Sequence, residues 1–186
     1  MIIYIHGFGG SGCGVKAEIF REYFKSNNNS FIAPSLSYVP ELAVKTLEEL
    51  IESYSEEVFL IGSSLGGYYA IYLADKYKIK ALLLNPSVKP METLGRLIGN
   101  THNFYDGSLF SWSQKHINML RQYDTKDRDL DKSLYFLLTK KDDDVLDYME
   151  AVTKLEGSKI IIEDSGGHSF EGVEKHFENI KDFFVK

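Results

Sequence analysis

The sequence has a single cysteine, Cys13, and no long apolar run. A lone cysteine cannot form a disulfide within the chain, which is typical of a protein from a reducing compartment. A membrane span needs about 18 uninterrupted apolar residues, and no stretch approaches that length. Residues 1–6 lack the basic flank and the cleavage site of a secretory signal. We therefore expect a cytoplasmic protein with no membrane-spanning segment and no membrane among its partners.

Positive charge is also scarce, because 21 lysines and arginines are outnumbered by 27 aspartates and glutamates, which gives a formal net charge of −6. An acidic chain binds nucleic acid and anionic membrane surfaces poorly, and no basic stripe with interleaved aromatic residues is present. Metal-binding patterns are missing as well. The sequence has no Asp-x-Asp-x-Asp-Gly loop, and its five histidines are not paired at ligand spacing. We expect no nucleic-acid partner and no metal ion.

The composition that remains is that of a globular protein. The 186 residues are 44% hydrophobic and 26% charged, with no internal repeat and no low-complexity tract. A chain of this length usually forms one domain and buries about 70% of the surface that its unfolded form exposes. We therefore predict a single domain over residues 1–186.

Short apolar runs alternate with amphipathic segments along most of the chain. Six runs are predicted to be strands, at residues 2–5, 31–34, 58–61, 81–84, 134–138 and 159–162. Helices are predicted at residues 15–25, from residue 40 onward, from the end of the third strand to about residue 76, and at residues 145–155 and 170–185. This alternation is typical of an α/β fold with a mostly parallel six-stranded sheet and helices on both faces. Such a sheet binds ligands at the carboxyl ends of its strands.

Residues 87–131 interrupt the alternation and are too long for an ordinary connection. We predict that they form a short helical cap, with helices at residues 91–98 and 113–123. The segment has more apolar residues than a solvated connection needs, Phe110 and Trp112 among them. Because the segment follows the strand at residues 81–84, which lies next to the third strand, it should pass over the third strand's carboxyl end. There it would form an apolar wall. The alternative, that these residues only complete the core, stays open.

A Gly-x-Ser-x-Gly pattern, Gly62-Ser63-Ser64-Leu65-Gly66, lies between the third strand and the following helix. At such a position it is typical of a sharp, strained turn that exposes its serine, with glycines where side chains would collide. Ser64 is therefore the candidate nucleophile. The backbone N–H of Leu65 has no partner within the helix and could stabilise an oxyanion. The pattern is short, so an ordinary glycine-rich loop is the alternative, and the assignment depends on partners elsewhere.

A serine hydroxyl needs a base to take its proton, and the base needs a carboxylate that fixes its tautomer. His168 follows the last predicted strand in a glycine-rich loop, which would bring it to the same edge of the sheet as Ser64. The acid should follow the preceding strand, where the chain has Asp142, Asp143 and Asp144. We choose Asp143, although its two neighbours stay open and one residue of the cluster should cap a helix. The order serine, acid, histidine is the α/β-hydrolase order.

The first predicted strand runs into a glycine-rich loop. Such a loop lets a backbone amide approach the oxygen that becomes negative during acyl transfer, and the expected donor is Phe8, with Gly9 second. The same loop matches Gly-x-Gly-x-x-Gly through Gly7, Gly9 and Gly12, which is the pattern of dinucleotide binding. That interpretation lacks its next element, because the second strand ends without an Asp or Glu to hold a ribose hydroxyl. We expect no cofactor.

Five motifs, in order along nearly the whole chain, carry a resemblance to a known family. They are Tyr4-Ile5-His6-Gly7-Phe8, Gly62-Ser63-Ser64-Leu65-Gly66-Gly67, Asn85-Pro86-Ser87-Val88-Lys89-Pro90, Asp143-Asp144-Val145-Leu146-Asp147-Tyr148 and Gly166-Gly167-His168-Ser169-Phe170. With these motifs the sequence resembles the α/β-hydrolase superfamily and, within it, the small bacterial YqiA-like esterases. The resemblance implies a single-domain α/β-hydrolase fold and an esterase or thioesterase that acts on acyl substrates. It also implies a catalytic triad of Ser64, Asp143 and His168.

The sequence therefore predicts a serine hydrolase that cleaves small acyl esters or thioesters through an acyl-enzyme intermediate, without a cofactor. The expected site consists of the triad Ser64, Asp143 and His168, the oxyanion-hole amides of Phe8 and Leu65, and the substrate contacts Gly9, Phe110 and Trp112. Two alternatives of other classes stay open. One is a catalytically silent binding protein of the same fold, and the other is a dinucleotide-binding protein that uses the Gly7 loop.

Overall fold

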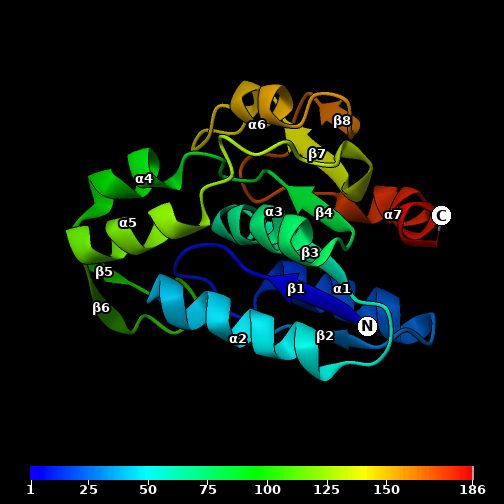
Figure 1. The fold of residues 1–186 in the computed structure, drawn as a ribbon, viewed down its shortest axis with the longest axis horizontal. Coiled ribbons are helices and arrows are strands. Elements are labelled where there is room, and N and C mark those ends of the chain that lie inside the picture. The colour runs from blue at the N-terminus through cyan, green and yellow to red at the C-terminus, as the bar shows by residue number, and fades with distance from the viewer. Residues whose placement is uncertain (186) are drawn as a thin grey trace.

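Six parallel strands form the central sheet of the computed structural model, which describes residues 1–185 (Figure 1). They are β1 (Ile2–Ile5), β2 (Phe31–Ile32), β3 (Phe59–Ser63), β4 (Ala81–Leu84), β7 (Tyr135–Lys140) and β8 (Lys159–Glu163). Their order in space is β2-β1-β3-β4-β7-β8, so the chain starts inside the sheet and builds outward in both directions. All neighbouring strands pair in parallel, which confirms the predicted α/β architecture.

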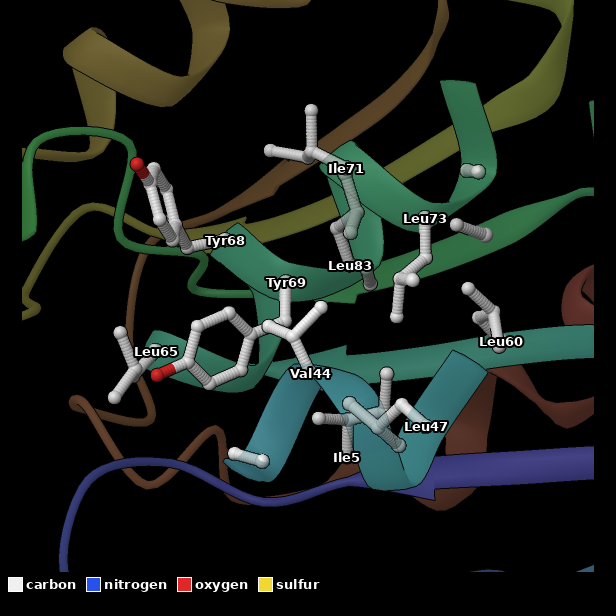
Figure 2. Close-up of a cluster of buried hydrophobic side chains, with 14 of the residues drawn as sticks. Ile5, Val44, Leu47, Leu60, Leu65, Tyr68, Tyr69, Ile71, Leu73 and Leu83 are labelled. Carbon is white, nitrogen blue, oxygen red and sulfur yellow. The ribbon is translucent and has the colours of Figure 1, made fainter. Parts of the chain in front are cut away.

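Helices cover both faces of this sheet. They are α1 (Val15–Ser26), α2 (Pro40–Ser53), α3 (Leu65–Tyr77), α6 (Tyr148–Lys154) and α7 (Phe177–Val185). Because successive strand residues point to opposite faces, Ile3 and Ile5 pack with α2, α3 and α6, and part of that cluster is drawn in Figure 2. Ile2 and Tyr4 pack with α1 and α7 on the other face. Strands buried on both faces need apolar residues at every position, which is why the sequence shows continuous apolar runs.

The carboxyl ends of the parallel strands meet at one edge of the sheet. The register pairs Ile5 of β1 with Gly62 of β3, and Lys140 of β7 with Glu163 of β8. The chain therefore leaves these strands at similar heights. As a result, the loops after β1, β3, β7 and β8 converge, and these loops carry the polar residues that the sequence singled out.

Residues 87–131 contain the predicted helices and also an antiparallel hairpin that the sequence did not predict. The helical parts are α4 (Pro90–Thr93), a 3₁₀ turn (Leu94–Leu97), α5 (Gln114–Leu120) and a second 3₁₀ turn (Arg121–Tyr123), and the paired strands are β5 (Gly99–His102) and β6 (Leu109–Trp112). Phe110 and Trp112 alternate with exposed residues along β6, as in a half-buried strand. In Figure 1 the hairpin lies beside the first turn of α2, and Phe110 stacks on Tyr38 just before that helix.

Two predicted helices begin later than expected. The helix predicted at residues 145–155 begins at Tyr148, because the Asp147 side chain caps it by accepting a backbone N–H bond of the first turn. The helix predicted at residues 170–185 begins as a 3₁₀ turn at Val173–His176, after a glycine with φ of 77°, and continues as α7. Among the described residues, no helix is long and apolar enough to cross a membrane.

Candidate active site

Ser64 occupies the turn between β3 and α3 with φ of 54° and ψ of −120°, a strained conformation for a residue other than glycine. The two glycines of the pattern make this turn possible. A Cβ atom on Gly62 would lie 2.5 Å from the carbonyl oxygen of Gly66, and one on Gly66 would lie 2.0 Å from that of Ile5. Neither position can hold a side chain, so the spacing in the sequence follows directly from the turn.

His168 reaches Ser64 from the loop after β8. Its Nε2 atom lies 3.1 Å from Ser64 Oγ, and its Nδ1 atom lies 2.8 Å from Oδ2 and 3.0 Å from Oδ1 of Asp143. An ionised carboxylate only accepts hydrogen bonds, so Nδ1 carries the imidazole proton and Nε2 is left free to accept one. The structure therefore places Ser64 Oγ against the unprotonated nitrogen of His168 and the Asp143 carboxylate against the protonated one. In this arrangement the serine could give its proton to the histidine.

Asp143 lies in the loop after β7 with its side chain 2% exposed. Burial alone would raise its pKa. The hydrogen bonds from His168 and from the backbone N–H groups of Leu146 and Val145, each 2.9 Å from Oδ1, outweigh burial and hold the pKa of Asp143 below its ordinary value. The carboxylate is therefore ionised at neutral pH, as an orienting acid must be.

Asp142 and Asp144, the two neighbours that the sequence left open, are placed differently. Asp142 accepts the backbone N–H bonds of Gly167 at 2.9 Å and Gly166 at 3.0 Å, and these bonds lower its pKa. It thus holds the histidine loop by its backbone. Asp144 is exposed. Within residues 1–185, Asp143 is the member of the cluster that contacts the His168 ring.

Asn85, which the sequence presented only as part of a motif, lies 2% exposed at the end of β4. Its amide nitrogen donates to the carbonyl oxygens of Gly167 at 2.9 Å and His168 at 3.2 Å. Its amide oxygen accepts from Lys140 N–H at 2.9 Å and Thr139 Oγ1 at 3.2 Å. One buried side chain therefore joins the ends of β4 and β7 to the histidine loop. An Asn-Pro pair directly after a buried strand was the available signal, but the sequence alone does not reveal its partners.

A buried ion pair lies next to the same loop. Lys140 has no exposed side-chain area and pairs with Glu163, which also contacts Lys175 Nζ at 2.6 Å. Burial would raise the pKa of Glu163, but the two lysines outweigh it and lower the pKa to about 2. A Cβ atom on Gly166 would lie 2.7 Å from Lys140 Nζ. The glycine therefore lets the histidine loop pass closely over the buried ammonium group.

The loop after β1 is fixed beside Ser64 by a neutral histidine. His6 Nε2 accepts the Leu36 N–H bond at 2.9 Å, so its Nδ1 carries the proton and donates to the Gly7 carbonyl at 2.8 Å. Burial lowers the pKa of His6, which favours this uncharged form. A Cβ atom on Gly7 would lie 3.1 Å from Ser64 Cβ, so the loop passes directly against the serine.

The two amides that the sequence proposed for an oxyanion hole belong to this region. Phe8 follows Gly7 in the loop, and Leu65 is the first residue of α3. Neither backbone N–H has an acceptor among the described residues. Two free donors beside one serine are what a developing negative oxygen would need.

A cavity of about 230 Å³ opens beside these amides. Phe8, Leu65 and Tyr69 line it from the body of the protein, and the hairpin and the Tyr38 region form the outer wall. Phe110 is 9% exposed, lines the cavity and stacks on Tyr38 with ring centroids 4.5 Å apart. Of residues 87–131, the hairpin therefore contributes Ser108, Leu109 and Phe110 to the lining of this cavity.

Of the other two predicted substrate contacts, Gly9 lines the cavity and Trp112 does not. Gly9 lines the cavity with φ of 63°, and its carbonyl accepts the Phe104 N–H bond at 2.7 Å from the hairpin loop. Trp112 is 1% exposed and does not line the cavity. Its indole N–H donates to the Leu94 carbonyl at 3.0 Å, and its ring packs edge-on against Phe8 at 4.8 Å. Trp112 therefore packs against the cavity lining at Phe8 and does not line the cavity itself.

The three glycines that match a dinucleotide-binding pattern lie at close contacts within the chain. A Cβ atom on Gly12 would lie 2.0 Å from the Ala33 carbonyl oxygen, so the loop packs tightly against the end of β2. Gly7 lies against Ser64, and Gly9 lies under the Phe104 ring. Close contacts within the chain therefore account for all three glycines. Within residues 1–185, no cluster of three or more metal-ligating side chains is present.

Comparison with known proteins identifies a family to which the chain belongs. The sequence model of the family described as "Uncharacterised protein family (UPF0227)" matches residues 1–185. A UPF0227 protein of Vibrio parahaemolyticus is 22% identical over 98% of this chain and 98% of its own length. A UPF0227 protein of Yersinia pseudotuberculosis is 24% identical over the same shares.

Solved structures of several α/β hydrolases have a similar fold. Mouse alpha/beta hydrolase domain-containing protein 10 superposes with a TM-score of 0.79 at 18% identity, covering 99% of this chain and 89% of that one. Est1E from Butyrivibrio proteoclasticus, solved with ferulic acid bound, has a TM-score of 0.73 at 13% identity, covering 99% and 87%. The monoacylglycerol lipase of Paleococcus ferrophilus has a TM-score of 0.72 at 16% identity, covering 99% and 93%. The fold is therefore that of the α/β hydrolases, as the sequence predicted.

Proposed function

From the premise that the chain belongs to the UPF0227 family and has the α/β-hydrolase fold, we propose that it is a serine hydrolase of carboxylic esters or thioesters. The observation that carries the proposal is the contact series Ser64 Oγ to His168 Nε2 at 3.1 Å and His168 Nδ1 to Asp143 at 2.8 Å. It is supported by the strained φ of Ser64, which presents the hydroxyl at the carboxyl edge of the sheet.

In the proposed reaction, Ser64 Oγ attacks the acyl carbon while His168 Nε2 takes its proton. The Asp143 carboxylate stabilises the imidazolium that forms. The carbonyl oxygen becomes negative and accepts the N–H bonds of Phe8 and Leu65. His168 then gives the proton to the leaving alcohol or thiol, and the acyl group stays on Ser64. Water, activated by the same histidine, hydrolyses the acyl-enzyme, and the mechanism needs no cofactor.

The cavity beside the oxyanion-hole amides is the proposed acyl site. It begins at Phe8 and Leu65, where the carbonyl oxygen would lie, and ends at Phe110 and the hairpin. Gly9 lines it, and Trp112 packs against the Phe8 ring from outside the cavity. Est1E, a neighbour by fold, has been solved with ferulic acid bound, and a carboxylic acid is the product of an ester hydrolase.

A fluorophosphonate probe tests the proposal directly, because it reacts with serines that a base has activated. We expect labelling of the wild-type protein at Ser64, found by peptide mapping, and no labelling of the Ser64→Ala variant. Ser63→Ala, its neighbour in the turn, is the matched control and should still be labelled. A folded wild-type protein that is not labelled and hydrolyses no ester would instead be a silent binding protein of this fold. The cytoplasmic location stays a prediction from the sequence.

A further inference from the structure

The cavity wall contains a buried phenol that nothing in the proposed mechanism uses. Tyr69 lies on α3 four residues after Leu65, so both side chains point from the same face of the helix into the cavity. The residue is 3% exposed. Figure 2 shows its ring extending past the apolar cluster, with the hydroxyl on the side of Leu65. The phenol therefore lies between the core and the cavity.

The Tyr69 hydroxyl has no hydrogen-bond partner among residues 1–185, unlike the hydroxyls of two other buried tyrosines. Tyr68 donates to the Leu120 carbonyl at 2.8 Å, and Tyr135 donates to the Ile71 carbonyl at 3.1 Å. The other buried polar side chain of the cavity, His6, has both ring nitrogens bonded. A buried polar group without a partner is unfavourable, so such a group calls for an explanation.

Its position supplies the explanation. The hydroxyl is not sealed in the core but borders the cavity, where water or a ligand can reach it. Burial raises the pKa of Tyr69, so it stays a neutral phenol that can donate one hydrogen bond and accept another. Phe8, Leu36 and Phe110 line the cavity with apolar side chains, and its polar lining residues Ser37, Asn103 and Ser108 make no hydrogen bond to the Tyr69 hydroxyl within residues 1–185. A ligand that fills the cavity must provide the partner itself.

We propose that Tyr69 is a specificity-determining residue that binds an oxygen atom on the acyl group of the substrate. The proposal rests on the proposed function, because it takes the cavity as the acyl site. The substrate class is then an oxygen-bearing acyl ester or thioester, with a hydroxyl or keto oxygen away from the scissile carbonyl. The size of the acyl group that fits follows from the cavity volume, since a cavity of about 150 Å³ binds benzene. The 230 Å³ found here holds about one ring and a few further atoms.

An acyl group made only of hydrocarbon would remove water from the hydroxyl and leave it unpaired. Sites built to bond a substrate oxygen discriminate against analogues that lack it for this reason. We expect a preference of about 10- to 100-fold in kcat/KM for the oxygen-bearing ester over its hydrocarbon match. A Phe side chain at position 69 would keep the ring and remove the unpaired group, so the preference should fall to about one.

Matched 4-nitrophenyl esters test the proposal in two arms. The first compares phenylacetate with its three ring-hydroxylated forms, and the second compares hexanoate with 5-oxohexanoate. We expect the wild-type protein to prefer the oxygen-bearing member in at least one arm. The arm that shows the preference tells whether Tyr69 binds a ring hydroxyl or a keto oxygen. Tyr69→Phe should lose the preference. Tyr68→Phe, which removes a phenol hydroxyl on the neighbouring residue outside the cavity, should keep it.

Binding measured on the Ser64→Ala protein separates this inference from the proposed function. Calorimetry with the same esters should give a Kd about 10-fold lower for the oxygen-bearing member, and the Ser64→Ala, Tyr69→Phe double variant should bind both members equally. If esters bind with this preference but are never hydrolysed, only the proposed function fails. If esters are hydrolysed without an oxygen preference in either arm, or if Tyr69→Phe keeps the preference, Tyr69 does not bind an oxygen atom of the acyl group and the proposal is wrong.

Discussion

Replacing Asn85 by alanine tests whether a buried amide positions the histidine from a distance. The side chain makes four hydrogen bonds, two to the carbonyls of Gly167 and His168 and two from Lys140 N–H and Thr139 Oγ1. The loop that it holds contains two glycines with positive φ, Gly166 and Gly167, and has little stiffness of its own. Without the amide, the loop keeps its contacts to Asp142 but loses those to β4.

The expected magnitudes follow from these contacts. At about 0.5–1.5 kcal/mol for each of the four hydrogen bonds, Asn85→Ala should lower the free energy of unfolding by about 2–6 kcal/mol. For a chain of this length, that corresponds to a fall in Tm of about 4–24 °C. A displacement of His168 by about 1 Å should lower kcat by about 100-fold. KM should change by a few-fold at most, because Asn85 does not line the cavity.

The assay measures kcat and KM with a short-chain 4-nitrophenyl ester, and Tm by circular dichroism. Tyr135→Phe is the control, because it removes a buried hydrogen bond to the Ile71 carbonyl at the opposite end of the sheet. It should lower Tm while leaving kcat unchanged. If Asn85→Ala loses stability but keeps kcat within about two-fold of the wild type, the amide is a structural residue and the positioning argument is wrong.

Three further predictions concern the acid, the ion pair and the cavity wall. Asp143→Asn should lower kcat by about 10⁴-fold while Asp142→Asn keeps most of it, and the reverse order would move the acid by one residue. Because the folded pKa of Glu163 is lowered to about 2, its contribution to stability is present above its unfolded pKa of about 4.5 and is lost as the pH falls toward 2. Urea titrations of Glu163→Gln should therefore show a weaker pH dependence than the wild type over that range, and an identical dependence would contradict the assignment. Phe110→Ala should shift the acyl-chain preference toward longer chains rather than abolish turnover, and an unchanged profile would place the acyl site elsewhere.

The strands of the sheet could be predicted because they are buried on both faces. Runs such as Ala81–Leu84 are apolar at every position and stand out in the sequence. The β5–β6 hairpin could not be predicted in the same way. Its first strand, Gly99–His102, is mostly exposed and polar, and only two residues of the second strand face inward. A short strand of that kind carries almost no periodic signal.

For the site, the sequence identifies residue types and loops but not contacts between loops. Asp142 and Asp143 are adjacent in sequence, and only the turn after β7 decides that one bonds the ring of His168 and the other bonds the backbone beside it. Asn85 and Tyr69 belong to recognisable segments. Asn85 matters because the fold surrounds its amide with hydrogen-bond partners, and Tyr69 matters because the fold leaves its hydroxyl without one. Such contacts arise from the tertiary structure and are not encoded in a local sequence pattern.

Mass spectrometry of the protein mixed with a short-chain 4-nitrophenyl ester tests the central claim most directly. Quenched before the steady state, the wild-type protein should carry one acyl group, and peptide mapping should place it on Ser64. A burst of nitrophenolate equal to the enzyme concentration should accompany it when deacylation is the slower step. Hydrolysis at the wild-type rate by the Ser64→Ala protein, or an acyl group found on Cys13 instead of Ser64, would contradict the account.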